Sequence, residues 1–143
     1  MMEVSLVRRR VRETLARAKQ AAADRRTRVD EATGEYQLFL DRVAVPLFRQ
    51  IANVLRAEKH AFSVSTPGAS VRLISDRASD EYIEISLDTT NASPQVIVYA
   101  RRTRGRRVNE VEIAIGTGGP VRELTEDDVL EVVLKELEPL VER

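Results

Sequence analysis

The side chains of this chain that are best suited to chemistry are arginines. Five of them fall within seven residues, Arg101-Arg102-Thr103-Arg104-Gly105-Arg106-Arg107. A guanidinium group binds phosphate through parallel N–H donors, so such a cluster favours contact with a nucleic-acid backbone. The competing interpretation is a solvated hairpin turn in which Gly105 supplies a positive φ. The sequence therefore predicts a basic hairpin tip, with nucleic-acid binding as the second hypothesis for function.

Other candidate groups lack the partners that a catalytic or metal site requires. The chain has one histidine, His60, and no cysteine, which excludes a disulfide, a thiolate nucleophile and a Cys/His zinc site. Asp76, Asp80 and Glu81 lack the spacing of a calcium loop, and we expect them in a solvated turn. Residues 116–120 lack the Lys-Ser/Thr end of a phosphate loop and are expected to form a connector. We expect no metal and no cofactor, and an enzyme without a recognisable motif is the third hypothesis.

The charge of the chain is sorted along its length. Residues 1–30 carry nine Arg/Lys against four Asp/Glu, whereas residues 121–143 carry three against eight. The formal charges of these ends are +5 and −5, and the total over the chain is zero. Such asymmetry indicates contacts between the ends, in one chain or between two copies, or with a charged partner.

The N-terminal segment, residues 3–31, is predicted to be a long helix with one apolar stripe. The stripe begins with Val4, Val7, Val11 and Leu15 and continues mainly as alanine. A helix of this length would measure roughly 40 Å, longer than a small domain is wide. We therefore expect part of it to project or to meet another chain, with Val4, Val7, Val11 and Leu15 as the self-association surface. Thr33-Gly34 is predicted to end the helix, because glycine is a frequent helix stop.

A second helical stretch is predicted from residue 35 to residue 61. Pro46 interrupts it, because proline lacks the donor for the bond to the Arg42 carbonyl and disfavours helical geometry at Val45. Two alternatives follow. The stretch is either one helix kinked near residues 44–46, or two pieces with Pro46 near the start of the second.

From Phe62 the apolar period changes from 3.6 to 2, which indicates strands. The expected strands are residues 62–65, 71–75, 81–88, 95–101 and 107–115. Their short connections favour an antiparallel meander of four or five strands. Tyr82 and Tyr99 are expected on one face, packed across strands and not stacked on RNA bases. The strand 95–100 is apolar on both faces, so we expect cover on both sides.

The last predicted element is a helix that begins at Thr125. Thr125 is followed three residues later by Asp128, which indicates a capping box. The apolar face consists of Val129, Leu130, Val133, Leu134, Leu137, Leu140 and Val141. We expect this helix to pack on the sheet, with Leu134 in the core.

Together these patterns predict an α+β fold in one domain. Its parts are a helical arm or hairpin (1–61), an antiparallel sheet (62–116) and a C-terminal helix (125–142). The N-terminus lacks the pattern of a signal peptide, and the longest apolar run, residues 96–100, is too short for a membrane span, so we expect a cytoplasmic protein. The leading hypothesis is a non-enzymatic protein-interaction module that self-associates as a homo-oligomer, with another protein partner as an alternative.

Overall fold

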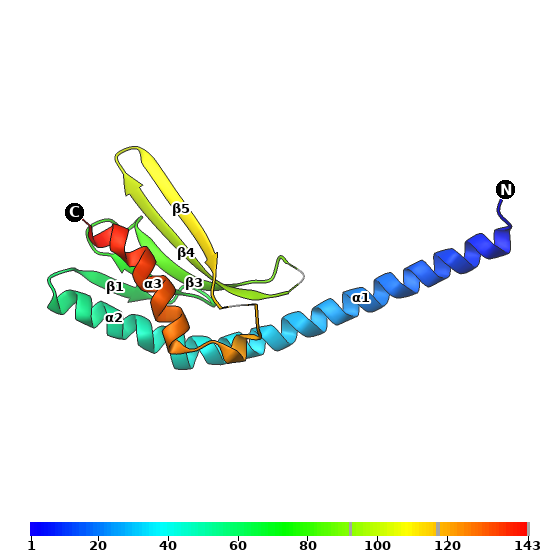
Figure 1. Ribbon diagram of the computed structural model, residues 1–143, viewed down its shortest axis with the longest axis horizontal. Helices are drawn as coiled ribbons and strands as arrows, with labels where there is room; N and C mark the ends of the chain where they lie inside the picture. Colours follow the sequence, from blue (N-terminus) through cyan, green and yellow to red (C-terminus); the bar gives the residue numbers. More distant parts are fainter. Residues whose placement is uncertain (92, 117, 143) are drawn as a thin grey trace.

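The computed structural model describes residues 1–91, 93–116 and 118–142, and it confirms the α+β fold. The helices are α1 (Val4–Phe39), a π-helical segment (Leu40–Ala44), α2 (Val45–Ala57), a 3-10 turn (Val121–Glu123) and α3 (Glu126–Val141). The strands are β1 (Phe62–Ser65), β2 (Val71–Ser75), β3 (Tyr82–Asp88), β4 (Gln95–Arg104) and β5 (Arg107–Ala114). Figure 1 shows a body made of the sheet with α2 and α3, from which most of α1 projects.

The predicted helix stop at Thr33-Gly34 is wrong, because α1 continues through both residues to Phe39. Ala32 and Tyr36, on either side of Gly34, are both buried. A mid-helix glycine costs only about 0.5–1 kcal/mol relative to alanine, which the packing of these neighbours outweighs. The N-terminal region is therefore a helical arm and not a hairpin.

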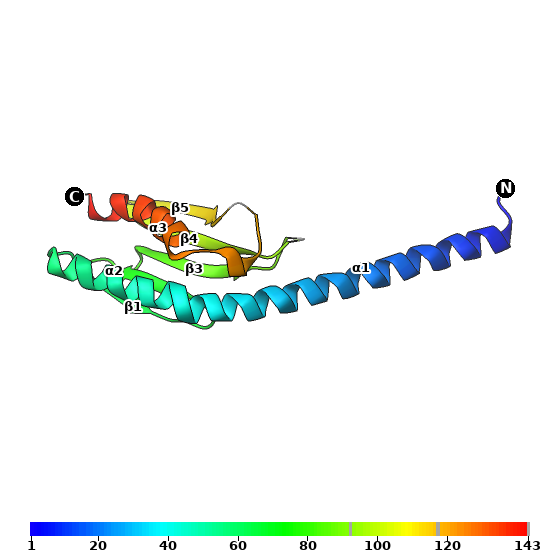
Figure 2. The same ribbon diagram turned by 60° about the horizontal axis from the view of Figure 1, so that its bottom comes forward.

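Pro46 is accommodated by the π-helical segment that precedes it. The Val45 N–H donates to the Leu40 carbonyl, five residues back, and Pro46 then lies in the first turn of α2. The first turn of a helix is where a missing N–H costs least. Of the two alternatives for this region, the structure shows a second helix that starts near the proline, joined to the first by a wide turn and not by a loop. The result is one continuous helical rod (Figures 1 and 2).

The sheet is an antiparallel meander in the order β1-β2-β3-β4-β5. The register pairs Leu73 with Ile83 and Ile85 with Val98, so these buried side chains share one face. On that face α2 packs against β1 and β2, and α3 packs against β3 and β4 (Figure 2). The body therefore has two layers, helices on one side of the sheet and an uncovered face on the other.

The expectation that β4 is covered on both sides is wrong. Val96 and Val98 face the helices and are buried, whereas Ile97 and Tyr99 lie on the uncovered face and are only half-buried. Neighbouring strands supply this partial cover, since Tyr99 and Tyr82 contact each other across β3 and β4. Cross-strand contacts of this kind stabilise a face that no helix covers.

Helix α3 begins with the predicted capping box. The Thr125 hydroxyl accepts from the Asp128 N–H at 3.2 Å, and the Asp128 carboxylate accepts from the Thr125 N–H at 2.9 Å. Val133 and Leu137 are buried against the core. The expectation that Leu134 is a core residue is wrong, because its side chain is 47% exposed. The apolar face of α3 is wider than the side that meets the sheet, and Leu134 lies on the outer part of it.

The helical geometry and open surroundings of Gly34 lead to a first prediction. A Cβ atom added at Gly34 meets nothing within 4 Å, and the residue has helical geometry. Replacing Gly34 by Ala should therefore raise the free energy of unfolding by about 0.5–1 kcal/mol, as measured by urea titration. Gly105→Ala is the matched control and should lower it, because Gly105 has a φ of +61°. A destabilising Gly34→Ala would show that α1 is not a regular helix there.

The orientation of α3 generates a second prediction. Leu137→Ala should cost about 2–5 kcal/mol of stability, because it opens a cavity in the core. Leu134→Ala should cost less than about 1 kcal/mol, because half of the side chain is already in solvent. Urea titration of the two variants compares them directly. A larger loss for Leu134 would mean that α3 faces the sheet with its other side.

Candidate functional site

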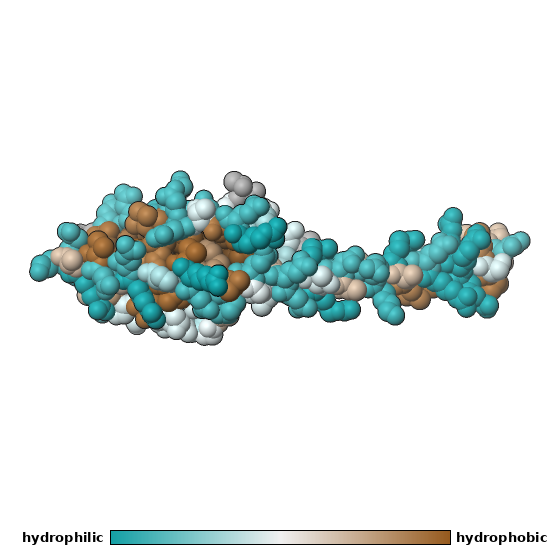
Figure 3. All heavy atoms as spheres, turned by 90° about the horizontal axis from the view of Figure 1, so that it is seen from below, coloured by the Kyte–Doolittle hydropathy of each residue, from teal (hydrophilic) through white to brown (hydrophobic). Residues whose placement is uncertain are grey.

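The first candidate surface is the projecting part of α1, residues 4–28, which we call the arm. Apart from Leu6 and Ala23, every side chain of the arm is exposed. The four apolar residues proposed for self-association are exposed by 75%, 44%, 51% and 63% in chain order, at Val4, Val7, Val11 and Leu15. The structure therefore brings these residues together on one helix and leaves them uncovered. Figure 3 shows apolar side chains exposed along the outer part of the arm, between hydrophilic ones.

The stripe of the arm continues the side of α1 that enters the core. Leu15, Ala22, Val29 and Tyr36 follow one another at intervals of seven residues. Seven residues are close to two helical turns, so these positions lie on nearly the same side. Exposure falls along this line, from exposed Leu15 through half-buried Val29 to buried Tyr36. This side of α1 is thus buried against the body at its C-terminal end and exposed to solvent at its N-terminal end.

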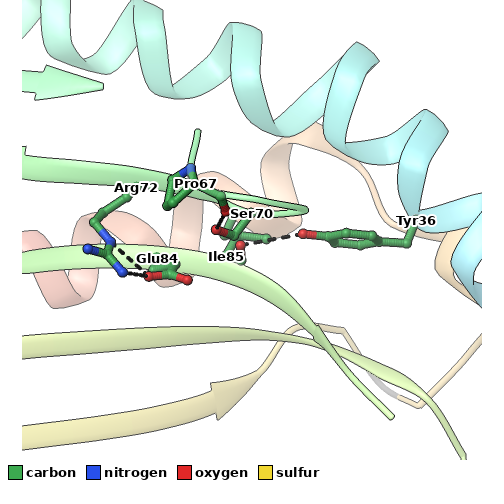
Figure 4. A network of polar contacts seen from close by, with 6 residues as sticks. All are labelled: Tyr36, Pro67, Ser70, Arg72, Glu84 and Ile85. Atoms are coloured by element: carbon green, nitrogen blue, oxygen red, sulfur yellow. Dashed lines mark hydrogen bonds and ion pairs between the residues drawn. The ribbon is translucent and has the colours of Figure 1, made fainter. Parts of the chain in front are cut away.

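Tyr36 fixes the direction in which the arm leaves the body. Its hydroxyl donates to the Ala69 carbonyl at 2.6 Å. The hydroxyl also makes a longer contact of 3.4 Å with the Ile85 carbonyl (Figure 4). Burial, together with the Glu84 carboxylate, raises the pKa of Tyr36 well above its usual range. The hydroxyl therefore stays protonated and keeps donating, which ties α1 to the β1–β2 turn.

The second candidate surface is an apolar groove between α2 and α3, with a volume of about 280 Å³. Its apolar lining includes Leu47, Ile51, Val54, Leu130, Leu134 and Leu137. Val54 and Leu134 are 57% and 47% exposed, and Figure 3 shows apolar side chains gathered on this underside of the body. Shallow apolar grooves between helices are typical binding places for the apolar side of another helix.

The third candidate surface is the β4–β5 hairpin. The predicted strand end at Arg101 is wrong, because the ladder continues to the Arg104–Arg107 pair and leaves a two-residue turn. The positive φ of this turn is at Gly105, the position that a type II′ turn reserves for glycine. Regular strand pairing therefore carries the arginines onto two faces, and they do not form one cluster at the tip.

The hairpin arginines have different surroundings. Arg101 pairs with Glu110 in the register, on the same face as Tyr99, and is half-buried. Partial burial and the Glu110 carboxylate raise the pKa of Tyr99 to about 12, so this ring stays neutral. Arg102 is also half-buried, beside α3. Of the five hairpin arginines, Arg104, Arg106 and Arg107 are exposed.

The expectation that Glu81 is a solvated turn residue is wrong. Its side chain is buried, and its carboxylate accepts from the Thr103 N–H at 3.3 Å. Glu81 thus joins the start of β3 to the end of β4, two residues before Gly105 in the hairpin turn. Asp76 and Asp80 are exposed, as expected for a turn. The backbone of β4 near the hairpin turn is therefore held by a buried carboxylate.

The tyrosines of the uncovered sheet face are engaged with their neighbours, as expected. The ring centroids of Tyr82 and Tyr99 lie 5.8 Å apart, and the Arg72 guanidinium lies 4.1 Å from the centroid of Tyr82. Arg72 also forms an ion pair with Glu84 (Figure 4). Glu84, Glu110 and Glu112 share this face in the register. The combination of occupied rings and carboxylates disfavours stacking of nucleic-acid bases here.

The remaining sequence candidates are not assembled into a site. His60 is exposed after the end of α2, and no group of three or more His, Cys, Asp or Glu side chains suited to a metal occurs among the described residues. Of the Gly-rich connector 116–120, Thr117 lies outside the described residues. No helix in the described part of the chain is long and apolar enough to cross a bilayer.

Comparisons with protein-family models, with curated proteins and with solved structures find no match to this chain. The candidate site therefore rests on geometry. The sequence predicts the stripe of the arm but not the groove, because its pattern places Leu134 in the core. The available signal was the width of the α3 face, which has more apolar residues than one contact with a sheet requires.

Proposed function

We propose that this protein is a non-enzymatic interaction module that self-associates through its arm. The observation that carries the proposal is the uncovered stripe Val4, Val7, Val11 and Leu15, on the side of α1 that elsewhere enters the core. Monomeric proteins seldom leave a long amphipathic helix uncovered, because most helical stability comes from packing of the apolar side.

The energetics require a matching surface. Burying a Val or Leu side chain completely contributes roughly 1.5–3 kcal/mol. Association costs about 4–15 kcal/mol in lost freedom of motion. The four stripe residues can offset this cost only when they are covered together and well. A second copy of the same chain is a partner that is always present with the arm.

Substitution of stripe residues by glutamate tests this proposal. Val11→Glu combined with Leu15→Glu should reduce the mass in solution from a multiple of 16.1 kDa to that of one chain, because buried charges in the contact would have no partners. Static light scattering at high micromolar concentration measures the mass. Circular dichroism should show a folded protein, because both residues are exposed.

The matched control is Ala16→Glu combined with Gln20→Glu. Each position lies five residues after its counterpart, roughly 140° around the helix, and the added charge and its spacing are the same. This control should keep the mass of the wild type. A wild type that remains a single chain at high concentration, or a stripe variant that keeps the wild-type mass, would contradict the proposal.

A second candidate function is polyanion binding by the hairpin, favoured by the exposure of Arg104, Arg106 and Arg107 around one turn. In Figure 1 this turn extends past the end of α3, which leaves it accessible to a duplex. Contacts made by three arginines to phosphates would be insensitive to base sequence and sensitive to salt.

Replacing Arg104, Arg106 and Arg107 by Ala should therefore abolish binding to a DNA duplex of arbitrary sequence at low ionic strength. The slope of log K against log salt should fall by about 2.7 in magnitude if all three contact phosphates. Fluorescence anisotropy measures both quantities. The matched control replaces Arg8, Arg9 and Arg10 by Ala and removes the same charge from the arm. Equal losses in both triple variants, or no binding by the wild type, would reject the hairpin as the site.

A further inference from the structure

The oppositely charged ends of the chain do not meet within one molecule. Figures 1 and 2 both show the N-terminal end of the arm far from α3 and pointing away from it. The arm carries nine Arg/Lys against two Asp/Glu, and α3 carries one against six. Contact between the ends of a single chain, one of the sequence-based alternatives, is therefore wrong for this structure, and any attraction between them acts between copies.

The arm and α3 display the same spacing of residues with opposite charge. In the arm, Val11 and Leu15 are flanked by Arg8, Arg12 and Lys19. In α3, Leu130 and Leu134 are flanked by Asp127, Glu131 and Glu138 at identical intervals. Residues three and four apart are neighbours on a helix surface. The three charged residues of each helix therefore lie along one side of its apolar pair, and this side is the same in the arm and in α3. All six charged side chains are exposed, and within the described residues none of them forms an ion pair.

We propose that the arm of one copy docks antiparallel to α3 of a second copy, with its stripe over the groove between α2 and α3. This inference rests on the proposed self-association and names its receptor surface. It explains why Val54 and Leu134 are exposed at the groove. It also gives both charged ends of the chain a partner.

The antiparallel direction follows from the positions of the flanks. On both helices the charged residues lie on the same side of the apolar pair when the helix is viewed from its N-terminus. When two such helices face each other, their charged residues meet only if the helices run in opposite directions. In that arrangement Val11 lies near Leu134, and Leu15 lies near Leu130. The charged residues then align as Arg8 with Glu138, Arg12 with Glu131, and Lys19 with Asp127.

Charge also disfavours the competing arrangement, in which two arms pair with each other. Each arm has an excess of seven positive charges, so two paired arms would face like charges along their whole length. Like charges across an interface suppress a pairing, whereas complementary potentials promote it. The acidic α3 supplies that complement, and Glu126 lines the groove itself.

Complementation between two full-length variants tests the receptor surface. The arm variant, Val11→Glu with Leu15→Glu, has an intact groove, and the groove variant, Val54→Glu with Leu134→Glu, has an intact arm. Each variant alone should have the mass of one chain. Their mixture should form pairs of two chains and grow no further, because it holds one intact arm and one intact groove per pair. Val108→Glu is the matched control, because Val108 is as exposed as Leu134 and lies on β5.

The outcomes separate this inference from the proposed function. A wild-type protein with the mass of one chain overturns both the proposed self-association and the docking on the groove. The second case is a wild-type protein that associates. If the groove variant then keeps the wild-type mass, or if the mixture of the two variants stays at 16.1 kDa, the groove is not the surface that binds the arm. The arm remains the association element in that case.

A charge exchange tests the alignment. Arg12→Glu and Glu131→Arg should each raise the dissociation constant by roughly two- to ten-fold at low salt, and the two changes in one chain should restore it. Arg12→Glu with Glu58→Arg is the control and should not restore it, because Glu58 lies beyond the end of α2. Failure of the Arg12/Glu131 exchange to restore association would contradict the antiparallel alignment.

Discussion

One apolar line along the helical rod of α1 and α2 determines both the core and the exposed surface of this protein. From Tyr36 to Ala52 the line is buried against the sheet, and from Val4 to Leu15 the same line is in solvent. The π-helical segment allows the rod to pass Pro46 without a loop, and Tyr36 anchors it to the Ala69 carbonyl. The arm therefore leaves the body in a defined direction, as a helix whose apolar side needs a partner.

The two-layer body determines which surfaces remain available to that partner. Helices α2 and α3 share one face of the sheet, and between them they leave the groove. The other face is stabilised by its own side chains, through the Arg72–Glu84 ion pair and the contact of Tyr82 with Tyr99. The groove and the arm are thus two apolar surfaces left exposed after folding, and they carry acidic and basic flanks respectively.

Patterns of short range were predictable from the sequence. The strand starts at Phe62, Val71, Gln95 and Arg107 follow from alternation, and the capping box at Thr125 follows from residue types at fixed spacing. The errors arose where tertiary packing decides. Gly34 remains helical because its neighbours are buried, and Glu81 is buried because the end of β4 passes beside it. The sequence gives the width of the apolar face of α3 but not which part of that face meets the sheet. Leu134 was therefore expected in the core, and the groove beside it was not predicted.

Hydrogen exchange in the arm tests the central claim, that docking on a second copy stabilises it. Backbone amides of residues 8–28 should exchange rapidly at low protein concentration and slowly at high concentration, while the amides of β3 and β4 keep the same protection throughout. The arm variant with glutamates at positions 11 and 15 should exchange rapidly at every concentration. Exchange in the wild-type arm that does not depend on concentration would contradict the account.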